Sequence, residues 1–430
     1  MIKSLLLKFV SARDDELAPM LWATAYGFAI QWSYYILRAV RDEISAADRG
    51  NLQILWTVVF LVMLVAVPAY SWTTTRFTRG VFVPLANRFF ILNLVLFYLA
   101  LALLPEGARP WIDRAFYVWA SVFALFVVTV FWGFMADIFK NEQGRRLFGF
   151  IAVGSSLGGM LGSKLTASLV ESLPAFTLLL VACVPLEVAS WCVGVLHRRF
   201  GGGSDTTQAA NRPIGGSAWS GIRVVFNSPY LLGIAGFIAL MTYASTVMYF
   251  LQADLIGAAI QDRAARTVLF ARIDFWANGL TLVLQAYFAA RIIRWFGVGI
   301  TLAALPVVAG LGFGWLGAAP LLGVFVVLQV IDRGVRYGLA KPAREILWTV
   351  VSREEKYKSK AFLDAAVYRG GDLVSVWAYA GMTAVGLSVS AIALTAVPLA
   401  AVWAVVGFRL GRRQETLARE ETPAIQAAPA

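Results

Sequence analysis

Long apolar segments recur along most of this sequence and constrain its fold more than any other feature. Each is close to the ~20 residues that an α-helix needs to cross the hydrocarbon core of a bilayer. The chain is therefore expected to be an all-α integral membrane protein with about twelve transmembrane helices. The expected spans are 19–37, 52–70, 81–104, 115–136, 147–170, 175–196, 229–251, 268–290, 297–316, 321–338, 361–385 and 391–408.

The composition supports this class and excludes others. Hydrophobic residues make up 59% of the chain and charged residues only 14%, against roughly 25% charged in soluble domains. The net charge is +12, but no basic soluble domain carries it, so nucleic acid is not an expected partner. One histidine and two cysteines in a single apolar segment predict neither a metal site nor a disulfide framework. No cofactor and no catalytic residue are expected.

A polar segment rich in Gly, Ser, Asn and Pro divides the spans into two sets of six. The expected organisation is an N-terminal half at 1–196, a linker at 197–222, a C-terminal half at 223–410 and a tail at 411–430. The polar end of the chain from Arg409 is expected to be disordered, and residues 1–15 to form an amphipathic surface helix. Paired glycines at 158–159 and 370–371 occupy corresponding spans of the two halves. Six plus six spans favour the major-facilitator arrangement, with a midplane substrate site between the halves.

The loop charges predict the orientation. Basic residues concentrate in alternate loops, above all in 140–146, 198–223 and 341–360. By the positive-inside rule these loops and the linker are cytoplasmic, as are both termini. The predicted location is the bacterial cytoplasmic (inner) membrane.

Charged residues inside the expected spans are the candidate site. Charge in hydrocarbon is costly, so such residues normally face a water-filled pathway or one another. The stretch 329–379 is the richest in them. The candidate substrate-binding residues are Arg38, Arg41, Asp42, Lys164, Arg272, Asp274, Asp332, Arg333, Arg336, Lys341, Arg369 and Asp372. Glu187, midway through the sixth span, is a candidate for ion coupling or a partner of Lys164.

The spacing of these residues leaves two interpretations open. Asp332 and Arg336 are four apart and share a helix face, and Arg369 and Asp372 are three apart. They are either ion pairs that fix helix packing or part of a cavity whose excess positive charge suits an anion. Arg272 and Asp274 are only two apart, so each requires its own partner. Lys164 and Arg88 are equally compatible with snorkelling to the membrane interface.

The glycine-rich run 154–162 does not match a phosphate-binding loop, because it lacks the strand-turn-helix context and the Gly-Lys-Ser/Thr ending. Small residues at Gly154, Gly158 and Gly162 instead predict close helix packing.

Three places resemble the ATP/ADP translocases of plastids and intracellular bacteria. The first runs from Tyr34 to Asp42 at the end of the first span, and the second is Phe131-Trp132-Gly133-Phe134 with Arg146-Leu147-Phe148. The third, Lys341 to Glu345 followed by Lys360-Ala361 and Asp364, is similar to the family's Lys-x-x-x-Glu and Lys-Ala-x-x-Asp elements. Arg41 stands where the family has a functional lysine, whereas Lys341 matches another. The chain resembles the divergent bacterial branch of the family more than the plastid members.

The resemblance implies a transporter of an anionic solute, a nucleotide exchanged in ATP/ADP fashion, by alternating access. Trp32, Tyr34 and Tyr35 can stack on a base. The alternative is a proton-coupled symporter or exporter of another organic anion. From another class, a membrane-embedded enzyme is disfavoured by the lack of a nucleophile motif or metal cluster. A signalling protein is disfavoured because it does not need so many charges inside the membrane. The expected partners are a small anionic substrate and the lipid bilayer, with the chain acting as a monomer.

Overall fold

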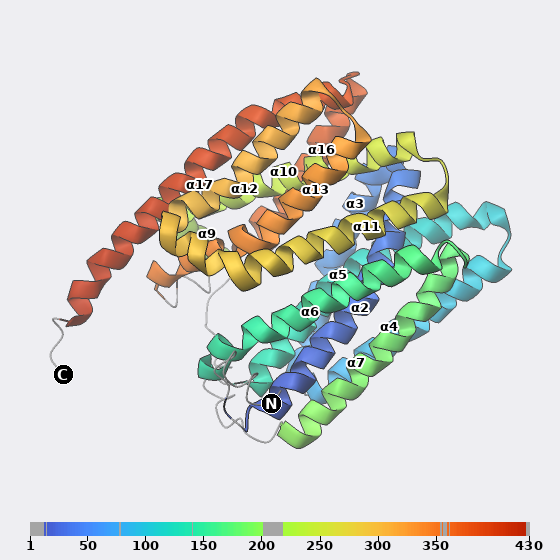
Figure 1. Cartoon of the computed structure of the whole chain (residues 1–430), viewed down its shortest axis with the longest axis horizontal. Coiled ribbons are helices and arrows are strands. Elements are labelled where there is room, and N and C mark those ends of the chain that lie inside the picture. Colours follow the sequence, from blue (N-terminus) through green and yellow to red (C-terminus); the bar gives the residue numbers. More distant parts are fainter. Residues whose placement is uncertain are drawn as a thin grey trace. The chain divides into compact units, whose positions relative to one another are not determined.

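The computed structural model describes residues 13, 15–76, 79–139, 141–200, 218–352, 355, 359–360 and 362–426. Within these ranges the regular structure is helical, with no strand. The chain forms two compact units (Figure 1). Unit 1 comprises Met1–Arg212 and Ile260–Gly279, and unit 2 comprises Pro213–Ala259 and Leu280–Ala430.

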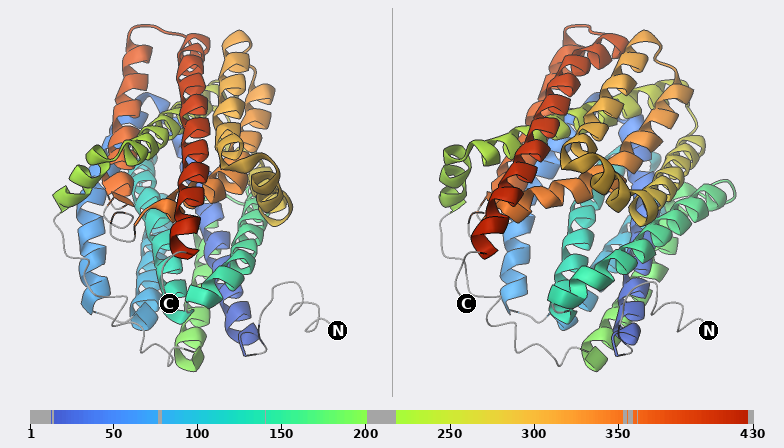
Figure 2. Two further views of the ribbon diagram at one scale, coloured as in Figure 1. Left: turned by 90° about the vertical axis from the view of Figure 1, so that its left-hand side faces the viewer. Right: turned by 60° about the vertical axis from the view of Figure 1, so that its left-hand side comes forward.

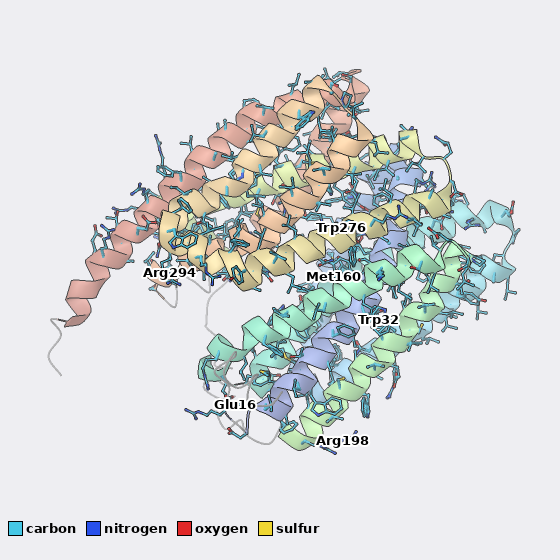
Figure 3. All side chains as sticks on the ribbon, viewed as in Figure 1. Glu16, Trp32, Met160, Arg198, Trp276 and Arg294 are labelled. Carbon is cyan, nitrogen blue, oxygen red and sulfur yellow. The ribbon has the colours of Figure 1, made fainter. Side chains whose placement is uncertain are left out.

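Unit 1 is built mainly from the spans that precede the linker. Each expected span of this half falls on one helix, although several of the helices extend well beyond the span. The helices are α2 (Leu17–Ala47), α3 (Leu52–Arg76), α4 (Arg79–Leu103), α5 (Arg109–Ile138), α6 (Asn141–Leu169) and α7 (Leu178–Phe200). In Figure 3, Glu16 before α2 and Arg198 near the end of α7 lie toward the same end of this unit, as expected after an even number of crossings.

The first helix is longer than the sequence analysis expected. The first span was placed at 19–37, but α2 continues to Ala47. No Gly or Pro interrupts it after Leu37, and its final turns stay buried through Ala46. Asp42 and Glu43 therefore lie on a packed helix.

Unit 2 contains the remaining spans and more irregular helices. Its α-helices are α9 (Ala218–Asn227), α10 (Pro229–Ala259), the end of α11 (Arg263–Val283), α12 (Ala289–Ala318), α13 (Leu322–Val335), α14 (Lys341–Ile346), α16 (Arg369–Ala384) and α17 (Val389–Gln426). Wider π-helical turns occur at η5 (Leu284–Phe288), η6 (Arg336–Ala340) and η8 (Leu363–Tyr368). Such turns are rare and are often found at functional sites.

The expected disorder after Arg409 is wrong for the residues that the structure describes. Helix α17 continues to Gln426 and packs along α12, as Figures 1 and 2 show. The segment is rich in Leu, Ala, Arg, Gln and Glu, which favour helix. Glu415 also accepts a hydrogen bond of 2.8 Å from the backbone N–H of Val298. That contact caps the part of α12 that follows a bend at Gly297, whose φ is 79°.

Seven segments among the described residues are long and apolar enough to span a membrane by length and composition. Helices α2, α6, α13 and α16 are not among them, although each coincides with an expected span. These four carry most of the charged candidates or the Gly/Ser-rich stretch, which lowers their hydropathy. The predicted surface helix at 1–15 lies almost wholly outside the described residues, as does linker segment 201–217.

Helices α2 and α6 approach closely because glycine lines their contact. A Cβ at Gly154 would meet Thr24, one at Gly158 would meet the backbone of Phe28, and one at Gly162 would meet the backbone of Trp32. Positions 154, 158 and 162 are four apart and lie on one face of α6. The prediction that the run serves packing is confirmed, and α6 is a continuous helix here rather than a phosphate-binding loop.

Candidate functional site

In unit 1, Arg38 is shared between two buried carboxylates. Its Nε lies 3.4 Å from Asp42 Oδ2 and 3.5 Å from Asp274 Oδ1. Both carboxylate side chains are only 2% exposed. Asp42 is on the same helix one turn later, whereas Asp274 comes from α11. Burial without such a partner would be strongly unfavourable for either carboxylate.

Arg41 adds a second cation to this group. Its Nη2 donates to Asp42 Oδ1 at 2.7 Å and its Nε donates to the same atom at 3.1 Å. Asp42 therefore accepts hydrogen bonds from two guanidinium groups. Four of the predicted site residues meet in one cluster: Arg38, Arg41, Asp42 and Asp274.

Aromatic and small residues border the cluster. The Arg38 guanidinium lies 5.6 Å from the centroid of the Tyr35 ring, and Tyr34 and Tyr35 form an edge contact with centroids 5.2 Å apart. A Cβ at Gly159 would meet the Tyr35 ring and the amide of Asn278. Glycine on α6 thus leaves room where α2 presents Tyr35 and α11 presents Asn278.

A further charged group, missed by the sequence reasoning, lies near the end of α2. Glu43, 3% exposed, accepts from Arg263 Nη2 at 2.7 Å and from Arg266 Nη2 at 2.6 Å. Arg263 also pairs with Asp113 at 2.9 Å. Glu43 lies beyond the expected first span at 19–37 and is not among the predicted site residues. Because no Gly or Pro follows Leu37 up to Ala47, the sequence does allow the helix to continue through Asp42 and Glu43.

Asp48 follows α2 and forms a more exposed pair. It accepts from Arg114 Nε at 2.6 Å and from Asn51 at 2.7 Å. Burial raises the pKa of Asp48, but the hydrogen bonds from Arg114 and Asn51 outweigh that effect and leave the pKa below its ordinary value.

The other unit 1 candidates lie apart from the cluster. Arg272 is exposed while Asp274 is buried, so the two do face different directions as expected. Lys164 is also exposed. Glu187, the coupling candidate, pairs with Arg88 at 2.7 Å, with side chains 51% and 63% exposed. That geometry gives Glu187 a partner other than Lys164 and places it on the exposed face of α7.

In unit 2, Asp332 and Arg336 form the ion pair that their spacing predicted. Arg336 Nη2 lies 2.8 Å from Asp332 Oδ2, and Nε donates to the same oxygen at 3.2 Å. Arg336 also donates to Ser245 Oγ of α10. The neighbouring Arg333 is 7% exposed. Arg336 begins the π-helical turn η6, so the pair lies at an irregular point in the tenth span.

Arg369 and Asp372 form a looser pair. Arg369 Nη1 is 4.0 Å from Asp372 Oδ2, and Thr246 Oγ1 donates to Asp372 Oδ1 at 3.3 Å. Ser245 and Thr246 are thus adjacent residues that each contact one pair. The sequence reasoning missed both, because small hydroxyl residues are common in membrane helices and carry little signal alone.

Two residues of the third motif that resembles the translocase family form an ion pair with each other. Lys360 Nζ lies 2.9 Å from Glu345 Oε2, and both side chains are partly exposed. Lys341 is exposed, with its Nζ 6.0 Å from the centroid of Tyr337. Ala361 lies outside the described residues.

In both units, guanidinium groups of arginines on the helices are paired with carboxylates. Arginine forks match the geometry of phosphate and carboxylate oxygens. Among the described residues no group of three or more His, Cys, Asp or Glu could hold a metal ion.

No protein-family model matches the sequence. The chain is 21% identical to an ADP,ATP carrier protein of Chlamydia muridarum, over 64% of this chain and 61% of that protein. It is 20% identical to an ADP,ATP carrier protein of Chlamydia pneumoniae, over 76% of this chain and 74% of that one. The first match thus spans less than two thirds of the relative's length.

Solved structures with the same fold are transporters. A POT family transporter bound to a thioalcohol-conjugated peptide has a TM-score of 0.64 at 9% identity, covering 93% of this chain and 96% of its own. A D-xylose-proton symporter has a TM-score of 0.60 at 11% identity, covering 92% and 96%. A nucleoside transporter has a TM-score of 0.57 at 10% identity, covering 93% and 99%.

These proteins are carriers or transporters rather than enzymes. The predicted all-α membrane fold is confirmed. The chain is a multi-pass membrane protein with the fold of the major facilitator transporters, and in sequence it is similar to the ADP,ATP carrier proteins.

Proposed function

We propose that the protein transports an anionic nucleotide across the bacterial cytoplasmic membrane by ATP/ADP-type exchange. The two six-helix halves (1–196 and 223–410) would alternate access to the substrate. The positive-inside pattern supports a cytoplasmic location for both termini, for the linker 197–222 and for the tail 411–430. The ADP,ATP carrier names of the relatives support the choice of substrate.

The observation that carries the proposal is the placement of arginine in the spans. Arg38 and Arg333 are largely buried, and Arg336 is 13% exposed. Lys164, Arg272 and Lys341 are exposed and have no carboxylate partner among the described residues. An anion that occupies the transport pathway during part of the cycle would offset the positive charge of the buried arginines, whose desolvation is otherwise unfavourable.

Within this proposal the site residues have distinct roles. Arg38, Arg41, Arg333, Arg336, Lys341 and Arg369 attract the phosphate oxygens. The acidic residues Asp42, Asp274, Asp332 and Asp372 hold the guanidinium groups in place while the site is empty. Tyr34 and Tyr35, which lie beside Arg38, stack on the base.

Exchange in proteoliposomes tests the proposal. Vesicles containing the purified protein are loaded with ADP, with AMP or with buffer, and uptake of labelled ATP is followed without any ion gradient. Exchange predicts rapid uptake only where a counter-nucleotide is inside. Uptake that ignores the internal nucleotide and follows an imposed proton gradient would instead support proton-coupled symport of an organic anion.

A further inference from the structure

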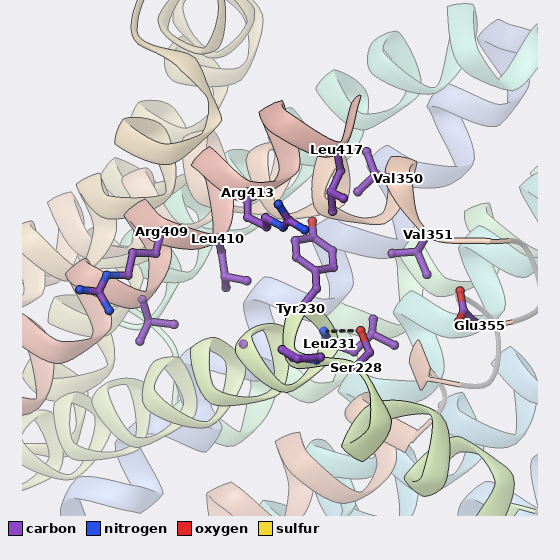
Figure 4. Close-up of a pocket in the computed structure, with 13 residues that line it drawn as sticks. Ser228, Tyr230, Leu231, Val350, Val351, Glu355, Arg409, Leu410, Arg413 and Leu417 are labelled. Atoms are coloured by element: carbon purple, nitrogen blue, oxygen red, sulfur yellow. Dashed lines mark hydrogen bonds between the residues drawn. The ribbon is translucent and has the colours of Figure 1, made fainter. Parts of the chain in front are cut away.

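A second basic site lies in unit 2, away from the charged residues of the spans. A cavity of about 560 Å³ opens between the start of α10, the segment after α14 and the end of α17 (Figure 4). That volume falls within the ~300–1,000 Å³ typical of small-ligand sites. Its polar lining includes Ser228, Tyr230, Glu355, Arg409 and Arg413.

Hydrogen bonds connect the segments that form the walls of the cavity. Tyr230 of α10 donates to the carbonyl of Leu347 at 2.8 Å. Gln414 of α17 donates to Thr349 Oγ1 at 3.2 Å. Leu347 and Thr349 both belong to the short helix η7 (Leu347–Val350), so the same segment is fixed to both neighbouring helices. The cavity is therefore a preformed feature of the unit.

Two arginines of the lining are available to a ligand. Arg409 and Arg413 are four residues apart, share one face of α17 and are exposed. Among the described residues neither has a carboxylate partner. Glu355 also lines the cavity; Figure 4 shows it at the opposite side from Arg409, with Arg413 beside Tyr230 between them, and it accepts a hydrogen bond of 2.8 Å from Ser352.

The cavity lies at the point along α17 where apolar residues give way to charged ones. The helix is apolar up to Phe408 and charged from Arg409 onward, beginning with Arg409, Arg412 and Arg413, which marks the boundary between hydrocarbon and water. The remaining lining is apolar, with Leu231, Val351, Val406 and Leu410 among it. Helix α9, directly before Ser228, exposes Phe226 and Arg223, a combination typical of helices at the membrane interface.

We propose that this cavity binds the phosphate headgroup of an anionic phospholipid from the leaflet on that side of the membrane. Arg409 and Arg413 hold the phosphate, and the apolar walls receive the glycerol end and the first part of the acyl chains. Basic pockets between transmembrane helices on the cytoplasmic side are suited to such headgroups. A soluble phosphate compound would use the arginines but not the apolar walls.

Native mass spectrometry of the full chain tests the proposal with phosphatidylglycerol and phosphatidylcholine as probes. The key variant is R409Q/R413Q, and R412Q is the matched control because Arg412 is exposed on the same helix but does not line the cavity. Each basic group near an anionic surface contributes about 1 kcal/mol and 1.4 kcal/mol is tenfold in affinity, so the double variant should lose roughly 10- to 30-fold in phosphatidylglycerol binding.

The expected control results are unchanged phosphatidylglycerol binding in R412Q and weak phosphatidylcholine binding in all forms. The single variants R409Q and R413Q, each replacing an exposed side chain, should show intermediate losses and guard against misfolding of the double variant. Equal losses in R412Q and R409Q/R413Q would overturn the site in favour of diffuse surface charge. Retained binding in the double variant would overturn it as well. Displacement of the lipid by glycerol phosphate or ADP at lower concentration than by phosphatidylglycerol would show a soluble ligand instead.

Discussion

The guanidinium of Arg38 lies 3.5 Å from a carboxylate oxygen of Asp274, which joins α2 to α11 inside unit 1. The two residues come from opposite sides of the linker in sequence, yet Ile260–Gly279 packs with the helices that precede it. This cation therefore links α11 to α2 between two buried carboxylates, in addition to the pairs of Glu43 with Arg263 and Arg266.

We expect Arg38→Gln to destabilise the protein by about 3–5 kcal/mol, because it leaves buried Asp42 and Asp274 without that partner. Thermal unfolding of the purified protein in detergent measures the change. Adding Asp274→Asn to Arg38→Gln should recover part of the loss. Arg114→Gln is the control, because its pair with Asp48 is partly exposed and a solvated pair contributes far less to stability than a buried one. Similar losses in both single variants would contradict the assignment.

Variants of the Asp332–Arg336 pair distinguish a role in helix packing from a role in transport. Each single change, Asp332→Asn or Arg336→Gln, leaves one charge without its partner and should lower folded yield. The double variant should recover that yield, because both charges are removed. If Arg336 contacts substrate, as proposed, transport stays low in the well-folded double variant. Near-normal transport there would assign the pair to helix packing alone.

Arg41 tests the requirement for charge at the end of α2. Arg41→Lys keeps the cation but loses the fork that contacts Asp42, whereas Arg41→Gln loses the charge. Initial rates of nucleotide uptake should fall in the order wild type, Arg41→Lys, Arg41→Gln, with at least a tenfold loss for the last if about 1.4 kcal/mol of binding is removed. Equal rates for the two variants would show that charge at this position is not used.

The glycine contact between α6 and α2 predicts a position-specific effect. A Cβ at Gly158 would run into the backbone of Phe28, while a Cβ at Gly149 on the same helix meets nothing within 4 Å. Gly158→Ala should therefore destabilise by roughly 1–3 kcal/mol through overpacking. Gly149→Ala should be neutral or stabilising by up to about 1 kcal/mol through helix propensity. Unfolding temperatures of the two variants, measured side by side, decide whether packing governs this run.

The spans, the glycine stripe and the pairs within one helix could be predicted from the sequence because their signals are local. Hydropathy over about 20 residues places a span, and spacing of three or four places Asp332 beside Arg336. The paired glycines of the two halves do not make equivalent contacts: a Cβ at Gly158 would meet the backbone of Phe28, whereas one at the corresponding Gly370 would meet nothing within 4 Å.

Contacts between distant helices could not be predicted in this way. Nothing near Glu43 in sequence indicates that Arg263 and Arg266 surround it, since that depends on how α2 and α11 pack. Likewise, nothing in the sequence indicates that Ser245 contacts Arg336 or that Thr246 contacts Asp372. The helix after Arg409 could not be predicted, because a charged segment near the end of a chain resembles a disordered tail. Its contact with α12 is not visible in the sequence.

Competition between nucleotides and nucleosides tests the central claim most directly. Binding of labelled ATP to the purified protein is measured against unlabelled ATP, ADP, AMP and adenosine. Recognition of phosphate by the arginines of the spans predicts that ATP and ADP compete strongly, AMP more weakly and adenosine hardly at all, with the preference weakened in Arg41→Gln. Competition by adenosine as strong as by ATP, or preferential binding of an organic cation, would contradict the account.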